Sequence, residues 1–170
     1  MNSQPLNFQD ADLARKTSAV WQLLATIPDP EIPVLNLVDL GVIRWVKFEP
    51  TNALNIGVTP TYSGCPATDV IHESILHCLN EHGYQGATVT QTISPPWSSA
   101  DITQRGRADL KAYGIAPPQM CNKPGEEGTP VCPLCDSQQV ELLSAFGSTP
   151  CKSLFRCKSC LEPFDYFKCV

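Results

Sequence analysis

The motifs Cys132-Pro-Leu-Cys135 and Cys157-Lys-Ser-Cys160 decide the fold of the C-terminal part of this chain. A two-residue gap lets both sulfurs of a motif point into one turn, and two such motifs complete the four-thiolate shell that zinc prefers. The 21 residues between them slightly exceed the usual spacing, but Gly147-Ser-Thr-Pro150 is a turn signal that fits a hairpin. We therefore predict a small β zinc ribbon with four structural ligands, Cys132, Cys135, Cys157 and Cys160.

Other interpretations of these four cysteines are less well supported or remain open. Disulfides are disfavoured because nine cysteines cannot all pair and because Met1-Asn-Ser-Gln-Pro5 does not begin an export signal. Dithiol exchange is disfavoured because the motif at Cys132 does not follow a βαβ pattern. An iron–sulfur cluster uses the same ligands, so the ligand set alone leaves zinc or iron open.

The distribution of cysteine divides the chain into two domains. Seven of the nine cysteines lie after position 120. We expect a first domain at 1–118, a linker rich in Pro, Gly and Glu at 119–130, and the zinc ribbon at 131–170. The ribbon has too few residues to bury a sufficient core without a staple such as a metal ion.

Charge and hydropathy exclude two classes of partner. Twelve basic against seventeen acidic residues give a net charge of −5, and the basic residues of the ribbon are scattered, so we expect no nucleic-acid binding. No run approaches the roughly 20 apolar residues that span a bilayer, so we expect no membrane insertion and a cytoplasmic protein.

The first domain alternates between helical and extended patterns. A helical repeat ends before Pro28, and period-two patterns at 42–48 and 54–58 predict an antiparallel hairpin. A helix follows Pro66, a third strand spans 87–93, and a last helix spans about 103–113. This order predicts an α+β fold, a small mixed sheet with helices on one face, followed by the small β zinc ribbon.

Cys65 is the candidate functional thiol of the first domain. It lies at or near the start of the helix after Pro66, where free N–H groups and the helix dipole favour a thiolate. The alternative is an inert packing thiol. Asp29 and Glu31, in a proline-bracketed loop, and Asp39 either stabilise that loop or face Cys65, and the sequence leaves both arrangements open.

Three further cysteines after position 120, Cys121, Cys151 and Cys169, lie outside the two motifs. Cys151 is six residues before Cys157, which makes it an alternative ligand or a neighbour of the zinc site, ranked below the four motif cysteines. No phosphate loop, dinucleotide fingerprint or serine elbow occurs, so nucleotide hydrolysis, hydride transfer and serine hydrolysis have no support. We expect a protein that is not itself an enzyme.

Two segments resemble a known family. The stretch Asp29-Pro-Glu-Ile-Pro-Val34 with Val38-Asp-Leu-Gly-Val42, and the stretch Thr59-Pro-Thr-Tyr-Ser-Gly-Cys-Pro66, are similar to the MIP18-type iron–sulfur assembly domain over residues 15–115. The resemblance implies a role in loading iron–sulfur clusters onto client proteins. It implies that Cys65 is the thiol that handles iron or sulfur.

Further segments narrow the resemblance. Ser94-Pro-Pro-Trp97, Gly114-Ile-Ala-Pro-Pro118, Phe146-Gly-Ser-Thr149 and Glu162-Pro-Phe-Asp-Tyr-Phe-Lys-Cys169 resemble the D-protein family of the phenylacetate-degradation pathway. That resemblance implies an accessory role: maturing or maintaining the cluster of the ferredoxin-type reductase component of the phenylacetyl-CoA epoxidase. The implied cofactors are structural zinc and transient iron or an iron–sulfur cluster.

The sequence also leaves a second role open, that of a structural adaptor in the epoxidase complex without cluster chemistry. The oxygenase subunits would then be partners beside the reductase. A homodimer is also left open. We expect Trp97 and Phe167 to be exposed and to serve as interface residues.

Overall fold

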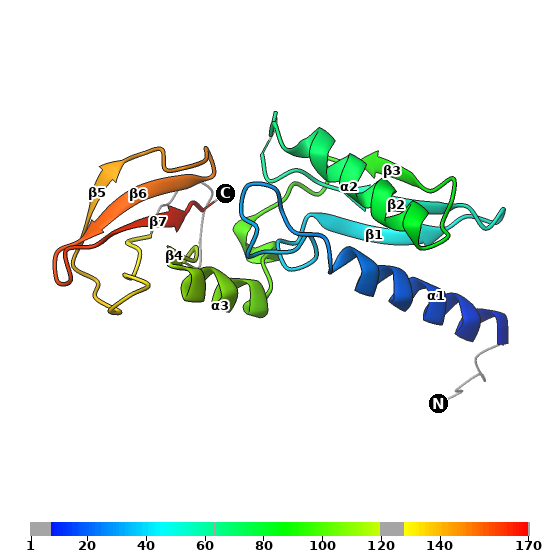
Figure 1. Cartoon of the computed structure of the whole chain (residues 1–170), viewed down its shortest axis with the longest axis horizontal. Helices are drawn as coiled ribbons and strands as arrows, with labels where there is room; N and C mark the ends of the chain where they lie inside the picture. The colour runs from blue at the N-terminus through cyan, green and yellow to red at the C-terminus, as the bar shows by residue number, and fades with distance from the viewer. Residues whose placement is uncertain (1–7, 63, 120–127, 170) are drawn as a thin grey trace.

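The computed structural model describes residues 8–62, 64–119 and 128–169 (Figure 1). Its elements are α1 (Phe8–Leu24), β1 (Ile43–Phe48), β2 (Leu54–Val58), α2 (Thr68–Glu81), β3 (Thr88–Gln91), a 3-10 turn (Ser99–Asp101), α3 (Gln104–Tyr113), β4 (Ile115–Ala116), β5 (Val140–Ser144), β6 (Lys152–Cys157) and β7 (Pro163–Phe167). They build two small sheets and three α-helices, which confirms the predicted α+β fold with a C-terminal ribbon.

The first sheet is mixed, with β2 at its centre. β2 pairs antiparallel with β1 and parallel with β3, and α2 makes the crossover between the two parallel strands. Alternate β2 residues, Leu54 and Ile56, are buried in the same core as Val20 of α1 and Ile75 of α2. Between them, Asn55 points to the other face and donates hydrogen bonds to threonines of β3. The helices α1 and α2 therefore cover one face (Figure 1).

The second sheet has the strand order β4-β7-β6-β5. Its core is aromatic: the Phe155 ring stacks on Phe164 at 6.0 Å and meets the edge of Tyr166 at 5.7 Å. The edge strand β4 follows α3 directly and pairs parallel with β7. The sequence did not predict β4, because a two-residue strand is too short to show a period-two pattern. The segment that directly follows α3, ahead of the knuckles, thus supplies one edge of the second sheet.

Trp97 and Phe167 lie in the junction between the two sheets. They are 4% and 1% exposed, their ring centroids are 6.0 Å apart, and Trp97 Nε1 donates a hydrogen bond to the Leu40 carbonyl. The prediction that they form an exposed interface is therefore wrong. The two rings come from positions 70 residues apart in the chain, so local sequence does not reveal their contact. No described helix is both long and apolar enough to cross a membrane.

This packing predicts that Phe167→Ala lowers the free energy of unfolding by about 3–5 kcal/mol, because it removes a fully buried aromatic side chain. The matched control is Phe146→Ala, since Phe146 is 69% exposed on the same ribbon and should change that free energy by under about 0.5 kcal/mol. Urea unfolding followed by tryptophan fluorescence measures both. Equal losses of unfolding free energy in the two variants would contradict a stabilising role of the buried Phe167 ring at the junction.

Candidate functional site

The four predicted zinc ligands converge in the ribbon. The sulfur atoms of Cys132, Cys135, Cys157 and Cys160 lie within 4.8 Å of one another. The Sγ atoms of Cys132 and Cys160 are 3.8 Å apart, and those of Cys135 and Cys157 are 3.5 Å apart. A tetrahedral ion with metal–sulfur bonds of about 2.3 Å has sulfur–sulfur edges of roughly 3.8 Å. The donor set and its spacing therefore fit a closed four-thiolate metal site.

Both knuckles use the same backbone turn. The residue after the second cysteine of each motif, Asp136 or Leu161, has a positive φ, of 57° and 68° respectively. In the second knuckle the backbone N–H groups of Ser159 and Cys160 point at Cys157 Sγ, at 3.4 and 3.5 Å. Donation from the Cys160 N–H lowers the pKa of Cys157 to about 6. The turn thus favours the thiolate form of Cys157, the form that binds metal.

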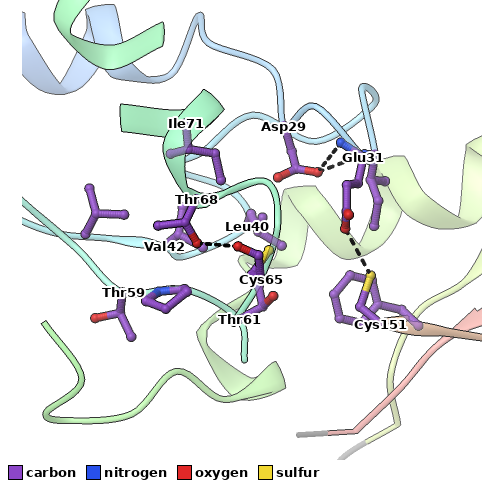
Figure 2. Close-up of a pocket in the computed structure, with 14 residues that line it drawn as sticks. Asp29, Glu31, Leu40, Val42, Thr59, Thr61, Cys65, Thr68, Ile71 and Cys151 are labelled. Carbon is purple, nitrogen blue, oxygen red and sulfur yellow. Dashed lines mark hydrogen bonds between the residues drawn. The ribbon is translucent and has the colours of Figure 1, made fainter. Parts of the chain in front are cut away.

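A second group of thiols and carboxylates surrounds a cavity between the two sheets (Figure 2). Asp29, Glu31, Cys65 and Cys151 line it, together with apolar side chains that include Ile71 and Phe167. Its volume of about 20 Å³ is room for one water molecule or one ion. The structure thus brings together Cys65 and two of the three predicted carboxylates, and adds Cys151 from the ribbon.

Asp29 fixes the loop that carries Glu31. It is 5% exposed, and its Oδ1 accepts hydrogen bonds from the N–H groups of Glu31 and Ile32, at 3.0 and 2.8 Å. Burial raises the pKa of the Asp29 carboxyl, although these two hydrogen bonds oppose the shift. The Asp29 N–H donates in turn to the Leu35 carbonyl at 2.8 Å. The loop is therefore held from both sides and presents Glu31 in a defined direction.

Glu31 connects the first domain to the ribbon through Cys151. The Cys151 Sγ lies 3.9 Å from Glu31 Oε2 and 3.0 Å from Thr149 Oγ1. Cys151 is a free thiol, 7% exposed, and burial raises its pKa. Burial and then the charge of Asp29 raise the pKa of the Glu31 carboxyl. A carboxylate and a thiol from distant parts of the chain thus meet at the cavity.

Cys65 reaches the cavity from the loop before α2. It lies two residues before the N-cap residue Ala67, and its carbonyl accepts hydrogen bonds from the N–H and the hydroxyl of Thr68, at 3.2 and 2.8 Å. These bonds hold the backbone, while the thiol is free and half-buried. Burial, followed by the nearby charges of Cys65 and Glu31, raises the pKa of Tyr62 to about 12.

Asp39 does not join this group. Its buried carboxylate accepts hydrogen bonds from Thr103 Oγ1 at 2.7 Å, from the Arg105 guanidinium and from the Asn36 amide. Burial raises its pKa, but these hydrogen bonds and the Arg105 charge outweigh burial, so the pKa is lowered. Asp39 therefore joins the loop before β1 to the start of α3, and its surroundings give it a structural role.

Cys151 is the site residue that the sequence placed elsewhere. It precedes β6, whereas Cys157 ends it, so six residues of strand at about 3.3 Å each put the two cysteines about 20 Å apart. The expectation that Cys151 belongs near the zinc site is therefore wrong. The extended sequence pattern between Cys151 and Cys157 was the signal that could have predicted this separation. Cys169 is in a disulfide, and Cys121 lies outside the described residues.

The fold and the two sites define a class of protein: an iron–sulfur cluster assembly domain joined to a zinc β ribbon. Two family models match the chain in this order, one described as "Iron-sulfur cluster assembly protein" over residues 17–80 and one as "PaaD zinc beta ribbon domain" over residues 116–168. A crystal structure of a DUF59 domain from Bacillus anthracis shares the fold, with a TM-score of 0.55 and 24% identity over 59% of this chain and 95% of that one.

A relative from Escherichia coli (strain K12), named as the D component of 1,2-phenylacetyl-CoA epoxidase, is 45% identical over 155 residues, 89% of this chain and 92% of the relative. The chain belongs to this family of epoxidase D proteins. A Porphyromonas gingivalis (strain ATCC BAA-308 / W83) protein named "Fe-S protein maturation auxiliary factor" is 31% identical over 92 residues, 54% of this chain and 87% of that protein.

The surroundings of Asp39 predict that Asp39→Asn lowers the free energy of unfolding at pH 7 by about 1.5–3 kcal/mol, the contribution of hydrogen bonds to a charged group. Because the folded-state pKa is lowered, the wild-type advantage is complete above about pH 5 and is lost as the pH falls through that pKa. Urea unfolding of both proteins at pH 7 and pH 3 measures the difference.

The matched control for Asp39→Asn is Glu73→Gln on the exposed face of α2, which should change the free energy of unfolding by under about 0.5 kcal/mol at either pH. A difference between wild type and Asp39→Asn that stays constant from pH 7 to pH 3 would contradict an ionised, hydrogen-bonded carboxylate.

Proposed function

We propose that this protein is an accessory factor of aerobic phenylacetate degradation that matures or maintains the iron–sulfur cluster of the epoxidase reductase component. The observation that carries the proposal is the free Cys65 thiol at a small cavity that also holds two carboxylates. The Escherichia coli relative is named as part of an epoxidase, and the Porphyromonas relative is named as a maturation factor. Together these names support an accessory, non-catalytic role.

The chemistry of the cavity suits iron or sulfide as cargo. Thiolates and carboxylates both bind Fe²⁺, and a thiol also carries sulfur as a persulfide. The cavity volume of about 20 Å³ matches a single ion or atom and is far below the 300–1,000 Å³ of ordinary small-molecule sites. The geometry therefore favours the handling of a small inorganic group over the binding of an acyl-CoA.

In this proposal the ribbon has a structural role. The four cysteines of the knuckles would hold zinc, and the ion would supply the folding free energy that a small sheet lacks. Four thiolates complete the coordination shell, which leaves no position for a substrate. The ribbon then serves as a rigid module that contacts the client protein and carries Cys151.

A structural adaptor without cluster chemistry is the second candidate. It is favoured by apolar side chains on and beside the edge strand β5: Leu142, Leu143 and Phe146 are 53%, 50% and 69% exposed. In this role the ribbon would bind the oxygenase subunits through that edge, and Cys65 would be dispensable. Stoichiometric co-purification with the oxygenase that survives Cys65→Ser would favour it.

The maturation role predicts that Cys65→Ser lowers the iron and acid-labile sulfide of the reductase component several-fold, to the content found without this protein. The reductase is purified anaerobically from cells that express it with wild type, with the variant or with no accessory protein. Cys78→Ser is the control, because Cys78 is a half-buried free thiol of α2 that does not line the cavity. Equal cluster content of the reductase with and without this protein would contradict the maturation role.

The structural role of the ribbon predicts that Cys135→Ser loses most of the bound zinc and the amide-exchange protection of β5–β7, because metal binding and folding are coupled. Strand β2 and helix α2 should keep their protection, since their core does not include the knuckles. Zinc analysis and hydrogen exchange measure both. Full zinc content in Cys135→Ser would show that Cys135 is not a ligand. In the wild-type protein, zinc that resists mild chelation would argue against a role in dithiol exchange.

A further inference from the structure

Cys151 is the feature that neither the zinc site nor the assembly domain explains. It belongs to the ribbon by sequence, yet its side chain is buried in the core of the first domain, about 20 Å from Cys157 along β6. It is a free thiol, and it lines the same cavity as Cys65.

Three separate segments of the chain bring donor atoms to this cavity. The proline-bracketed loop brings Asp29 and Glu31, the loop before α2 brings Cys65, and the end of the β5–β6 connection brings Cys151 (Figure 2). The remaining lining is mostly apolar, and Lys152 is the nearby cation, 4% exposed and 3.6 Å from Asp165. Two thiols and two carboxylates around a space for one ion are the donors expected of a metal site.

We propose that Cys65 and Cys151, with Glu31 as a third ligand, bind a single Fe²⁺ ion across the junction of the two domains. The identity of the ion rests on the proposed function, whereas the ligand set rests on the cavity. On binding, both thiols and the carboxyl group act as anions, and the thiol protons pass to solvent. The ribbon thus completes a site that the assembly domain alone would leave with one thiol.

The spacing of Glu31 and Cys151 already suits a shared ion. A tetrahedral ion with bonds of about 2.3 Å to sulfur and 2.1 Å to oxygen separates these two atoms by roughly 3.6 Å, and the structure has 3.9 Å. Among the described residues, the four knuckle cysteines are the only group of three or more potential ligands whose ligand atoms all lie within 4.8 Å of one another. Cys65 therefore moves toward the Glu31–Cys151 pair when the ion enters.

The surroundings of the Cys65 side chain permit this movement, while hydrogen bonds from Thr68 hold its backbone carbonyl. Gly64 has φ +84°, is exposed, and has no atom within 4 Å of the position of a Cβ. Asp29 and Glu31 lie on a loop with several internal hydrogen bonds, and Cys151 is buried, so the other ligands are the fixed part of the site. Mixed sulfur and oxygen donors select iron or zinc over Ca²⁺ and Mg²⁺, which take oxygen ligands.

The test uses the full chain with one zinc ion in the ribbon and Co²⁺ alone as the probe, under anaerobic conditions. Co²⁺ bound to thiolates shows sulfur-to-metal charge-transfer absorption that grows with the number of thiolates. Wild type should bind one Co²⁺ beyond the zinc. Cys151→Ser and Cys65→Ser should each raise the dissociation constant at least about tenfold and halve the absorption per bound ion. Excess Fe²⁺ should displace the Co²⁺.

Two further variants separate ligand loss from misfolding. Glu31→Gln should weaken binding about tenfold while leaving the charge-transfer absorption per ion unchanged, because both thiolates remain. Cys78→Ser, outside the cavity, should change neither quantity. Each variant is checked for one bound zinc and for wild-type circular dichroism before titration, and a Cys151 variant that fails this check is replaced by Cys151→Ala.

Three results would overturn the proposal. They are the absence of Co²⁺ binding to wild type beyond the zinc site, an unchanged affinity and absorption in Cys151→Ser, and failure of Fe²⁺ to displace Co²⁺. None of these depends on the reductase, so they are distinct from a failure of the proposed function. If the cavity binds the ion as expected but the cluster content of the reductase does not change, only the maturation role is contradicted.

Discussion

The packing of Phe167 against Trp97 is the contact on which the rest of the molecule depends. Phe167 ends β7, and the register of β6 and β7 places Lys152 opposite it. The Lys168 N–H, one residue further, donates to the Cys151 carbonyl at 2.9 Å. Once the Phe167 ring is buried in the first domain, Cys151 is carried to the edge of the same cavity. Hydrophobic burial at the junction therefore determines where a reactive group lies.

Charge at the junction is balanced rather than excluded. Asp29 and Glu31 are placed in a mostly apolar wall, which by itself would disfavour their ionised forms. The positive charge of Lys152 acts on both carboxyl groups in the opposite sense and is itself close to Asp165. The two domains thus share one electrostatic arrangement, in which the ribbon supplies the cation and the first domain supplies most of the anions. The charge of Lys152 therefore favours the ionised forms of both carboxyl groups.

The sequence was informative where chemistry and spacing are local. The spacing of Cys132 and Cys135 within one turn was enough to predict a metal knuckle, and the position of Pro66 was enough to predict the start of α2 nearby. The surroundings of Asp39 and Cys151 could not be predicted, because they depend on long-range contacts. Asp39 meets Arg105 from a helix more than sixty residues later, and Cys151 meets Glu31 from 120 residues earlier.

The two sulfur sites differ in how complete a ligand shell they offer, and this property distinguishes a structural metal site from a site for a metal that is passed on. The knuckles offer four thiolates at tetrahedral spacing, so an ion there has a complete shell and no open position. The cavity offers two thiols and two carboxylates, and the Cys65 thiol would have to approach the others, so the proposed ion would be held by an incomplete and adjustable set. Strand β6 joins the two sites, with a knuckle cysteine at its end and Cys151 just before its start. In the proposed function, a permanently bound ion would stiffen the ribbon, and the stiff ribbon would hold Cys151 where a second ion can be taken up and released.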